Sequence, residues 1–441
     1  MMPGAVAGGS GSNASNLAAA PSPSGGTKRR RRGPRPEELR YQRSFVSAPE
    51  VDLRSTESRY RHRAWIAGRL RKSNGRGPAV CGCELPAHDV EEIEWRVARD
   101  GRAPPANTLR CKNAIVCPVC AVWQARKLQE RLHEVVEATV AIGGSVGMQT
   151  LTLRHHRGHD LKCLRRVATE AFRRVESGRG WLKLKREGGL LGQAKVVEAP
   201  WGPAHGWHPH LHLPLVFDHR DEARVRAAAA GLEARWIAEV IALGFEAVPA
   251  GQDFKPCYDA AGAAGYCAKL AAELAHGWAK QLERQDRHVL VGIFTLPHRA
   301  MARDGEADRL FLEYAEAMSG LQQGRVSSPL RQALKLTKRP AFDGGEAKDR
   351  GGETVGCQSR EQYLELYARG KLPDLVAMIE VECPPDIGIG GWPRVSEWIE
   401  ATLRQLPQPP AASVAAFGRT RRQRDSSTPS RFLWRIDGGT R

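Results

Sequence analysis

The stretch Trp207-His208-Pro209-His210-Leu211-His212-Leu213-Pro214 places a histidine at every second position. A period of two is the period of a β-strand, so the three imidazoles share one face of that strand. The apolar residues at the alternate positions are Leu211, Leu213, Leu215 and Phe217. Same-face neighbours on a strand lie roughly 6–7 Å apart, which is within reach of one divalent cation. The stretch therefore predicts a metal-binding strand whose other face packs on a core.

The composition of the chain points to a polyanionic partner. The 441 residues contain 67 Lys+Arg against 49 Asp+Glu, a formal charge of +18. An excess of this size favours nucleic acid over a membrane surface. No apolar run approaches the roughly 18 residues of a transmembrane helix, and the first residues lack the basic-then-apolar order of a secretory signal. We expect a cytoplasmic protein whose ten cysteines are thiols or metal ligands.

Composition divides the chain into five segments. We expect a disordered basic tail at 1–60, a Cys-rich zinc-binding element at 61–120, the domain of the histidine strand at 121–300, a helical region of unassigned role at 301–405, and a second disordered basic tail at 406–441. The first tail holds a basic run that is either solvated or a non-specific DNA contact: Lys28, Arg29, Arg30, Arg31 and Arg32.

Hydrophobic periodicity predicts an α+β domain. Helical spacing marks 121–140, 161–175, 221–242 and 259–276, whereas period-two patterns mark strands at 145–153, 192–199 and 208–217, with an extended stretch at 244–256. The strands are close enough in sequence to be linked as hairpins. We therefore expect a central antiparallel sheet with helices covering one face.

The cysteines cluster ahead of the first of these helices. Cys117-Pro-Val-Cys120 is a common half of a zinc site, because two thiolates three residues apart can reach one tetrahedral ion. Cys111 is the third candidate ligand, and either Cys81 or Cys83 would be the fourth. Such a site would be structural, with every coordination position filled by protein.

Two further features complement the histidine strand. A symmetric hairpin centred near Pro203 would pair Glu198 with His208 and put the carboxylate on the histidine face. Tyr266 and Lys269, three residues apart, share one face of the predicted 259–276 helix. An ammonium and a bound divalent cation would both favour the phenolate form of Tyr266.

The residues alone leave several interpretations open. The spacing of His208, His210 and His212 also fits histidine-triad nucleotide hydrolases, in which the middle histidine attacks a phosphate. A metallo-β-lactamase-type site needs Asp-His shortly after the two histidines, and Leu213-Pro214 stands there instead. A zinc-dependent DNA-binding regulator without enzymatic activity would explain the charge and the cysteines, but not the histidine strand.

Taken in order, the motifs resemble those of the HUH endonucleases, specifically rolling-circle replication initiators of small Gram-positive plasmids. The quoted motifs are Thr150-Leu-Thr-Leu153, Glu198 with Gly206-Trp-His-Pro-His-Leu-His212, and Tyr266-Cys-Ala-Lys269. The Cys111…Cys117-Pro-x-Cys120 element also occurs in that group, as does the region of Leu312–Gly320 and Ser328–Arg331. The resemblance covers roughly residues 111–331.

The resemblance implies a central antiparallel sheet and a site-specific single-strand nickase. His210 and His212, with Glu198, would hold Mg²⁺ or Mn²⁺ against the scissile phosphate, and His208 would support the ligands. Tyr266 would attack, leaving a 5′-phosphotyrosine link and a free 3′-hydroxyl, with Lys269 helping to neutralise the phosphate. The implied partners are single-stranded or plasmid origin DNA and a host helicase and polymerase, with no membrane.

One position departs from a close branch of that family. A glutamate one helical turn before the tyrosine assists termination there, and Gly262 occupies this position here. The same chemistry would also serve a transposase or a conjugative relaxase; the cysteine element and the 311–331 region favour replication.

Overall fold

A computed structural model describes residues 55–71, 83–87, 89–99, 101–257, 262–263, 265, 290–322, 324–336 and 352–405. The basic run at 28–32, Cys81, Tyr266 and Lys269 lie outside these residues, as does the tail at 406–441. Helix α2 begins at Thr56, inside the segment expected to be disordered.

An antiparallel sheet forms the centre of the fold. Its strand order among the described residues is β7-β2-β6-β3-β8. The strands are β2 (Ser145–Thr152), β3 (Leu190–Glu198), β6 (His210–Phe217), β7 (Asp253–Cys257) and β8 (Gly324–Val326). The histidine strand β6 is therefore central, with a neighbour on each side. All eight of its residues are buried, so both of its faces are covered.

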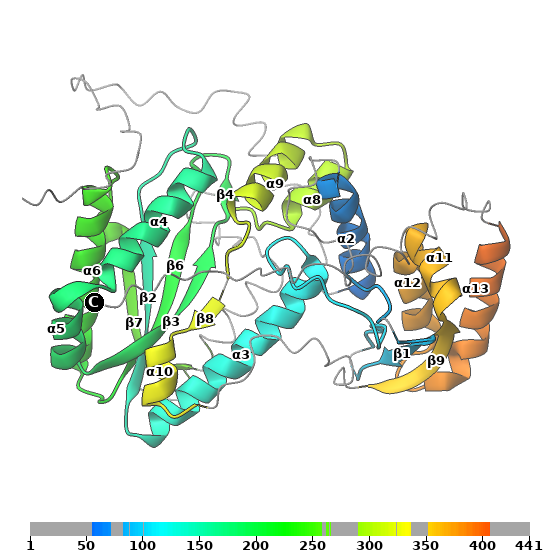
Figure 1. The fold of residues 1–441 in the computed structure, drawn as a ribbon, viewed down its shortest axis with the longest axis horizontal. Coiled ribbons are helices and arrows are strands. Elements are labelled where there is room, and N and C mark those ends of the chain that lie inside the picture. The colour runs from blue at the N-terminus through cyan, green and yellow to red at the C-terminus, as the bar shows by residue number, and fades with distance from the viewer. Residues whose placement is uncertain are drawn as a thin grey trace, which may run out of the picture.

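Helices cover both faces of this sheet, which corrects the expectation of one covered face (Figure 1). Leu211, Leu213 and Phe217 face the helices α4 (Leu161–Val175), α5 (Gly178–Gly188) and α6 (Glu222–Ala242). The opposite face, which carries Val216 and the histidines, packs its apolar part against α3 (Pro118–Ala141) and α10 (Ser328–Ala333). The period of two fixed which residues share a face, but it carried no information on what covers the second face.

The hairpin between β3 and β6 differs from the predicted register by two residues. Glu198 pairs with His210, not with His208. The small strands β4 (Trp201–Gly202) and β5 (Gly206–Trp207) continue the hairpin, which is centred on Ala204 rather than Pro203. Gly206 has φ +78° and lies against the Arg157 backbone, which favours glycine there. A shift of two residues preserves the face, so Glu198 still lies on the histidine side.

A second group of elements joins the Cys-rich segment to the C-terminal region. Strand β1 (Glu92–Val97) pairs antiparallel with β9 (Glu353–Ser359), more than 250 residues away in the sequence. Helices α11 (Arg360–Ala368), α12 (Leu372–Glu382) and α13 (Trp392–Gln405) pack around this pair, and α2 (Thr56–Arg71) lies between the group and the sheet domain (Figure 1). The expected segments 61–120 and 301–405 thus share one core in the structure.

Four further elements of the described residues are η1 (Pro249–Gly251), α8 (Thr295–Met301), α9 (Gly305–Ala317) and η3 (Gly388–Gly391). They pack against those already named: α8 and α9 against each other and against α2 and α4, respectively, η1 against α6, and η3 against β9. Gly262, Ala263 and Gly265 are helical, in agreement with the helix expected at 259–276. Among the described residues, no helix combines the length and apolar character needed to cross a bilayer.

Candidate metal centres

The structure brings Glu198, His210 and His212 together at one end of the histidine face. Their ligand atoms all lie within 4.8 Å of one another. Oε2 of Glu198 is 2.9 Å from Nε2 of His210 and 3.3 Å from Nε2 of His212. These are the residues that the sequence proposed for a metal, and a carboxylate with two imidazoles suits a divalent cation.

The other ring nitrogen of each histidine has its own partner. Nδ1 of His210 donates to the backbone carbonyl of His208 at 3.0 Å, and Nδ1 of His212 lies 3.2 Å from the Thr150 hydroxyl. The carbonyl contact of His210 leaves Nε2 of its neutral imidazole as a lone pair aimed at the carboxylate. A lone pair and a carboxylate repel, so this arrangement needs positive charge between them, supplied by protons or by a cation.

Glu198 is partly buried, in a way that also fits a cation. Its Oε1 is buried and makes no hydrogen bond within the described part of the chain. Burial raises the pKa of its carboxyl, but the hydrogen bonds and charges of His210 and His212 outweigh burial and hold the pKa below its usual range. The carboxylate is therefore charged at neutral pH, with one oxygen available to a bound ion.

His208 lies beside this group rather than in it. Its Nδ1 is 3.0 Å from Nε2 of His155, whose own Nδ1 donates to the Leu153 carbonyl at 3.1 Å. A carbonyl only accepts, so His155 offers Nε2 as the acceptor for His208. Burial lowers the pKa of His155, and the charges of neighbouring histidines lower it further. The sequence did not single out His155, because it follows β2 in a loop and shows no period with β6.

Tyr314 is a second residue that the sequence did not assign to the site. Its ring centroid is 5.8 Å from that of Trp207, and the residue is 2% exposed. Burial, and then the negative charge of Glu198, raise the pKa of Tyr314. This tyrosine therefore keeps its proton at neutral pH and is a poor nucleophile, although it is close to the carboxylate.

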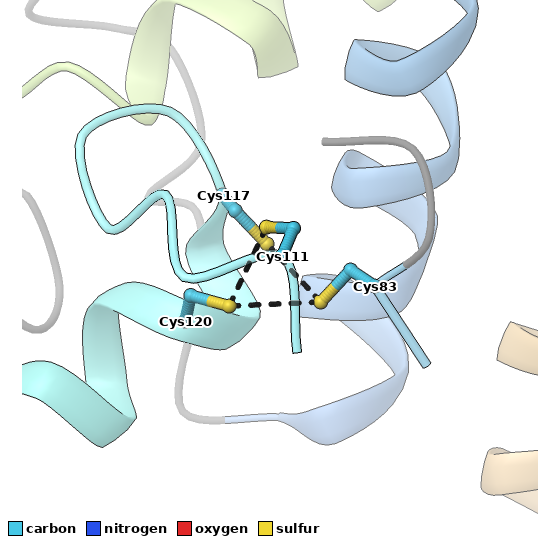
Figure 2. Close-up of side chains that lie close together, drawn as sticks. All are labelled: Cys83, Cys111, Cys117 and Cys120. Carbon is cyan, nitrogen blue, oxygen red and sulfur yellow. Dashed lines mark hydrogen bonds between the residues drawn. The ribbon is translucent and has the colours of Figure 1, made fainter. Parts of the chain in front are cut away.

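The second centre is a tetrad of cysteines (Figure 2). Sγ of Cys120 lies 3.6 Å from that of Cys83 and 3.5 Å from that of Cys111, and Sγ of Cys117 lies 3.7 Å from that of Cys83. A tetrahedral ion with metal–sulfur bonds of about 2.3 Å requires sulfur separations of about 3.8 Å. The four sulfurs therefore already stand near the corners of such a site. Cys83, not Cys81, completes the tetrad among the described residues.

The local fold explains how these cysteines converge. Cys117 is the N-cap of α3, with Pro118 in the first turn, so Cys117 and Cys120 lie one turn apart at its start. Hydrogen bonds from Cys111, Cys117 and Cys120 lower the pKa of Cys83, which favours its thiolate. Arg63 donates to the Cys83 carbonyl at 2.9 Å. Its positive charge would offset part of the negative charge of four thiolates around a dication.

Two tyrosines of α11 hold the turn that carries Cys83. The hydroxyl of Tyr367 donates to the Cys83 carbonyl at 3.2 Å, and that of Tyr363 donates to the Glu84 carbonyl at 2.7 Å. The fully buried Glu84 also forms an ion pair with Arg110. The C-terminal helices are thus part of the support of the cysteine centre, which a fragment ending near residue 125 would lack.

Replacing Thr150 by valine tests whether its hydroxyl orients His212. We expect the affinity for Mn²⁺ to fall by about 10- to 100-fold, because partners that orient metal ligands have effects of that size. Isothermal titration calorimetry on the whole chain measures this change. Thr152→Val is the matched control, because the Thr152 hydroxyl donates to the Gly251 carbonyl and not to a ligand. Equal losses in the two variants would contradict the orienting role.

Two curated proteins of Streptomyces are similar to part of this chain. A Neomycin resistance protein of Streptomyces cyanogenus is 28% identical over 148 residues, covering 28% of this chain and 34% of that protein. A Protein rep of Streptomyces lividans is 28% identical over 142 residues, covering 26% of this chain and 31% of that protein. The match spans about a third of each relative. No protein-family model and no solved structure matches the chain.

Proposed function

We propose that this protein is an HUH-type single-strand DNA endonuclease that initiates rolling-circle replication of a plasmid. The observation that carries the proposal is the convergence of Glu198, His210 and His212 on the central strands of an antiparallel sheet. The two Nε2 atoms and one carboxylate oxygen face a common point, and the partners of both Nδ1 atoms hold them there.

The chemistry divides between a cation and the side chains of the chain. A Mg²⁺ or Mn²⁺ ion held by the three ligands would polarise the scissile phosphate and orient it. The Tyr266 oxygen attacks the phosphorus, the bond from phosphorus to the 3′-oxygen breaks, and the released oxygen takes a proton. The products are a 5′-phosphotyrosine and a free 3′-hydroxyl. Lys269 would neutralise charge on the phosphate.

The described neighbours of Tyr266 support its role as the nucleophile. Ala263, three residues earlier in the sequence, is buried with Val146 and Met148 in the core on the histidine face. Ala263 therefore lies on the side of the sheet that carries the metal ligands, three residues from Tyr266 in the sequence. Tyr314, the buried tyrosine near Glu198, is unsuited to attack because its pKa is raised.

Two observations favour this function over the alternatives. The similarity to a Protein rep supports replication over transposition or conjugation as the use of the nickase. Nε2 of His210 is directed at Glu198, at 2.9 Å, which suits a metal ligand better than the nucleophile of a histidine-triad hydrolase. A host polymerase would extend the free 3′-hydroxyl, and a host helicase would separate the strands.

We propose zinc for the cysteine centre. Four thiolates at near-tetrahedral spacing are the donor set of structural zinc sites, with no position left for substrate. In the nickase the ion would fix the start of α3 against the turn that carries Cys83. One end of α3 would thus be anchored by the metal, while its later turns pack on the sheet.

A covalent adduct assay tests the proposed nickase. The whole chain is incubated with Mn²⁺ and origin-derived single-stranded DNA labelled at its 3′ end, and the products are separated in SDS. We expect a labelled protein–DNA adduct that is absent from Tyr266→Phe and absent when no divalent cation is added. In the proposed reaction, the Tyr266 phenol is the group that becomes covalently bonded to the DNA.

Tyr258→Phe is the matched control, because it removes a phenol eight residues earlier in the sequence that has no role in the proposal. It should form the adduct at the wild-type rate. An adduct that persists in Tyr266→Phe contradicts the proposal. Nucleotide hydrolysis lost only in His210→Ala would indicate a histidine-triad hydrolase, and DNA binding without cleavage in the wild type would indicate a regulator.

A further inference from the structure

A chain of hydrogen bonds runs from the end of β2 to the metal ligand His210. Nδ1 of His155 donates to the Leu153 carbonyl at 3.1 Å, and Nε2 of the same ring lies 3.0 Å from Nδ1 of His208. The backbone carbonyl of His208 in turn accepts from Nδ1 of His210 at 3.0 Å. A residue 53 positions before His208 in the sequence is thus connected to a ligand that the sequence analysis assigned to the metal.

The two carbonyl groups of this chain fix where its hydrogens lie. A carbonyl oxygen only accepts, so Nδ1 of His155 and Nδ1 of His210 each carry a hydrogen. Burial lowers the pKa of His155 by more than its hydrogen bond to Leu153 raises it, so the ring is neutral at neutral pH and its Nε2 accepts. The hydrogen between the two rings therefore belongs to Nδ1 of His208.

Both ends of the chain are held by the fold. Leu153 is 2% exposed in the core that follows β2. The backbone N–H of His208 donates to the Pro200 carbonyl at 2.8 Å. The rings of His155 and His208 meet edge to face, with centroids 4.6 Å apart. The N–H group and the ring of His208 are thus both fixed, which leaves its carbonyl little freedom to turn.

We propose that His155 is a positioning residue of the metal centre: it holds the ring of His208, and so fixes the carbonyl that turns Nε2 of His210 toward Glu198. His155 acts through His208 and is not itself a ligand, because the ligand group among the described residues is Glu198, His210 and His212. Partners that orient metal ligands tune the affinity for the ion. This inference rests on the metal centre of the proposed function, but it needs neither DNA nor Tyr266.

NMR of the histidine side chains tests the hydrogen-bond chain directly. The whole chain is prepared with nitrogen-labelled histidine and no added ion, and the His208 signals are identified by their absence from His208→Gln. We expect a hydrogen on Nδ1 of His208 in the wild type. His155→Ala removes the acceptor, so the hydrogen should then be shared between both ring nitrogens of His208. His155→Gln should restore the wild-type pattern, because an amide can also donate and accept.

Isothermal titration calorimetry with Mn²⁺ measures the consequence for the ion. His155→Ala should weaken binding by about 3- to 10-fold, less than the roughly 10- to 100-fold of residues that contact a ligand directly. His155→Gln should recover most of the affinity. His156→Ala is the matched control, because this neighbouring histidine is exposed and its Nδ1 accepts from the Gly158 N–H within the loop. It should leave the affinity and the His208 signals unchanged.

Two results would overturn the role of His155. One is a wild type in which Nδ1 of His208 carries no hydrogen. The other is an equal affinity for Mn²⁺ in His155→Ala and His156→Ala. If His155→Ala does not fold, the wild-type signals and His155→Gln decide. A wild type that shows the expected signals and binds Mn²⁺, but forms no adduct with DNA, would contradict the nickase and still support the positioning role.

Discussion

His210→Ala is expected to slow strand cleavage by about 10³-fold or more, the largest effect we predict for a single substitution. Loss of a divalent cation at a reacting phosphate removes several kcal/mol of transition-state stabilisation, and each 1.4 kcal/mol is about tenfold in rate. Truncation also leaves the buried Glu198 carboxylate facing only His212, which lowers the affinity for the ion. Single-turnover cleavage of a labelled oligonucleotide at saturating protein measures the effect.

His133→Ala is the control for this substitution, because His133 is exposed on α3, where its ring lies 3.4 Å from the Glu137 carboxylate and outside both metal centres. It should cleave at the wild-type rate. Glu198→Gln keeps the shape of the side chain but removes its charge, so it should need more Mn²⁺ for half-maximal cleavage. A His210→Ala variant that retains cleavage within about tenfold would exclude the proposed role of the metal site.

Cys117→Ser is expected to release the metal of the cysteine tetrad and to unfold the surrounding region. In small zinc domains, zinc binding contributes about 10–16 kcal/mol to the free energy of folding. This is comparable with the whole free energy of unfolding of a typical domain. Cys117 is fully buried at the N-cap position of α3, so the loss of its bond to the metal also frees the start of that helix. Metal analysis of the purified chain should show stoichiometric zinc in the wild type and little in the variant. Thermal unfolding should begin at a lower temperature.

Cys357→Ser is the matched control, because this cysteine is exposed on β9 and is not part of the tetrad. It should keep both the metal and the stability. Hydrogen exchange locates the effect: protection should fall in α2, α11 and the first turns of α3, and stay high in β6. Full metal content in Cys117→Ser, or equal loss in both variants, would contradict the tetrad as a metal site.

The local periodicity of the chain predicted much of the sheet domain. The expected helix at 121–140 is α3, and the strands at 145–153 and 208–217 are β2 and β6, each within three residues. These elements have apolar residues at regular spacing over more than one turn or pleat. The sequence of each segment is therefore sufficient to predict its secondary structure. The helix α5 was missed because Gly178–Gly188 contains three glycines and no long apolar stripe.

Contacts between distant segments could not be predicted in the same way. The pairing of β1 with β9, and the hydrogen bonds of Tyr363 and Tyr367 to the turn at Cys83, join residues that no local pattern relates. For the same reason the sequence left the choice between Cys81 and Cys83 open. Cys83 lies in a turn held by Arg63 of α2 and by Tyr363 and Tyr367 of α11, whereas Cys81 lies outside the described residues.

The sequence by itself determined which side chains share a face: a period of two puts Glu198, His210 and His212 on one side even when the hairpin register is two residues from the prediction. Only the tertiary structure decided how these side chains are aimed. The His208 carbonyl and the Thr150 hydroxyl, from the chain before β6 and from its neighbour β2, take up the two Nδ1 atoms and turn both Nε2 atoms toward the carboxylate. Alternation along a strand is a property of the backbone, whereas the orientation of a ring depends on partners that the fold brings to it.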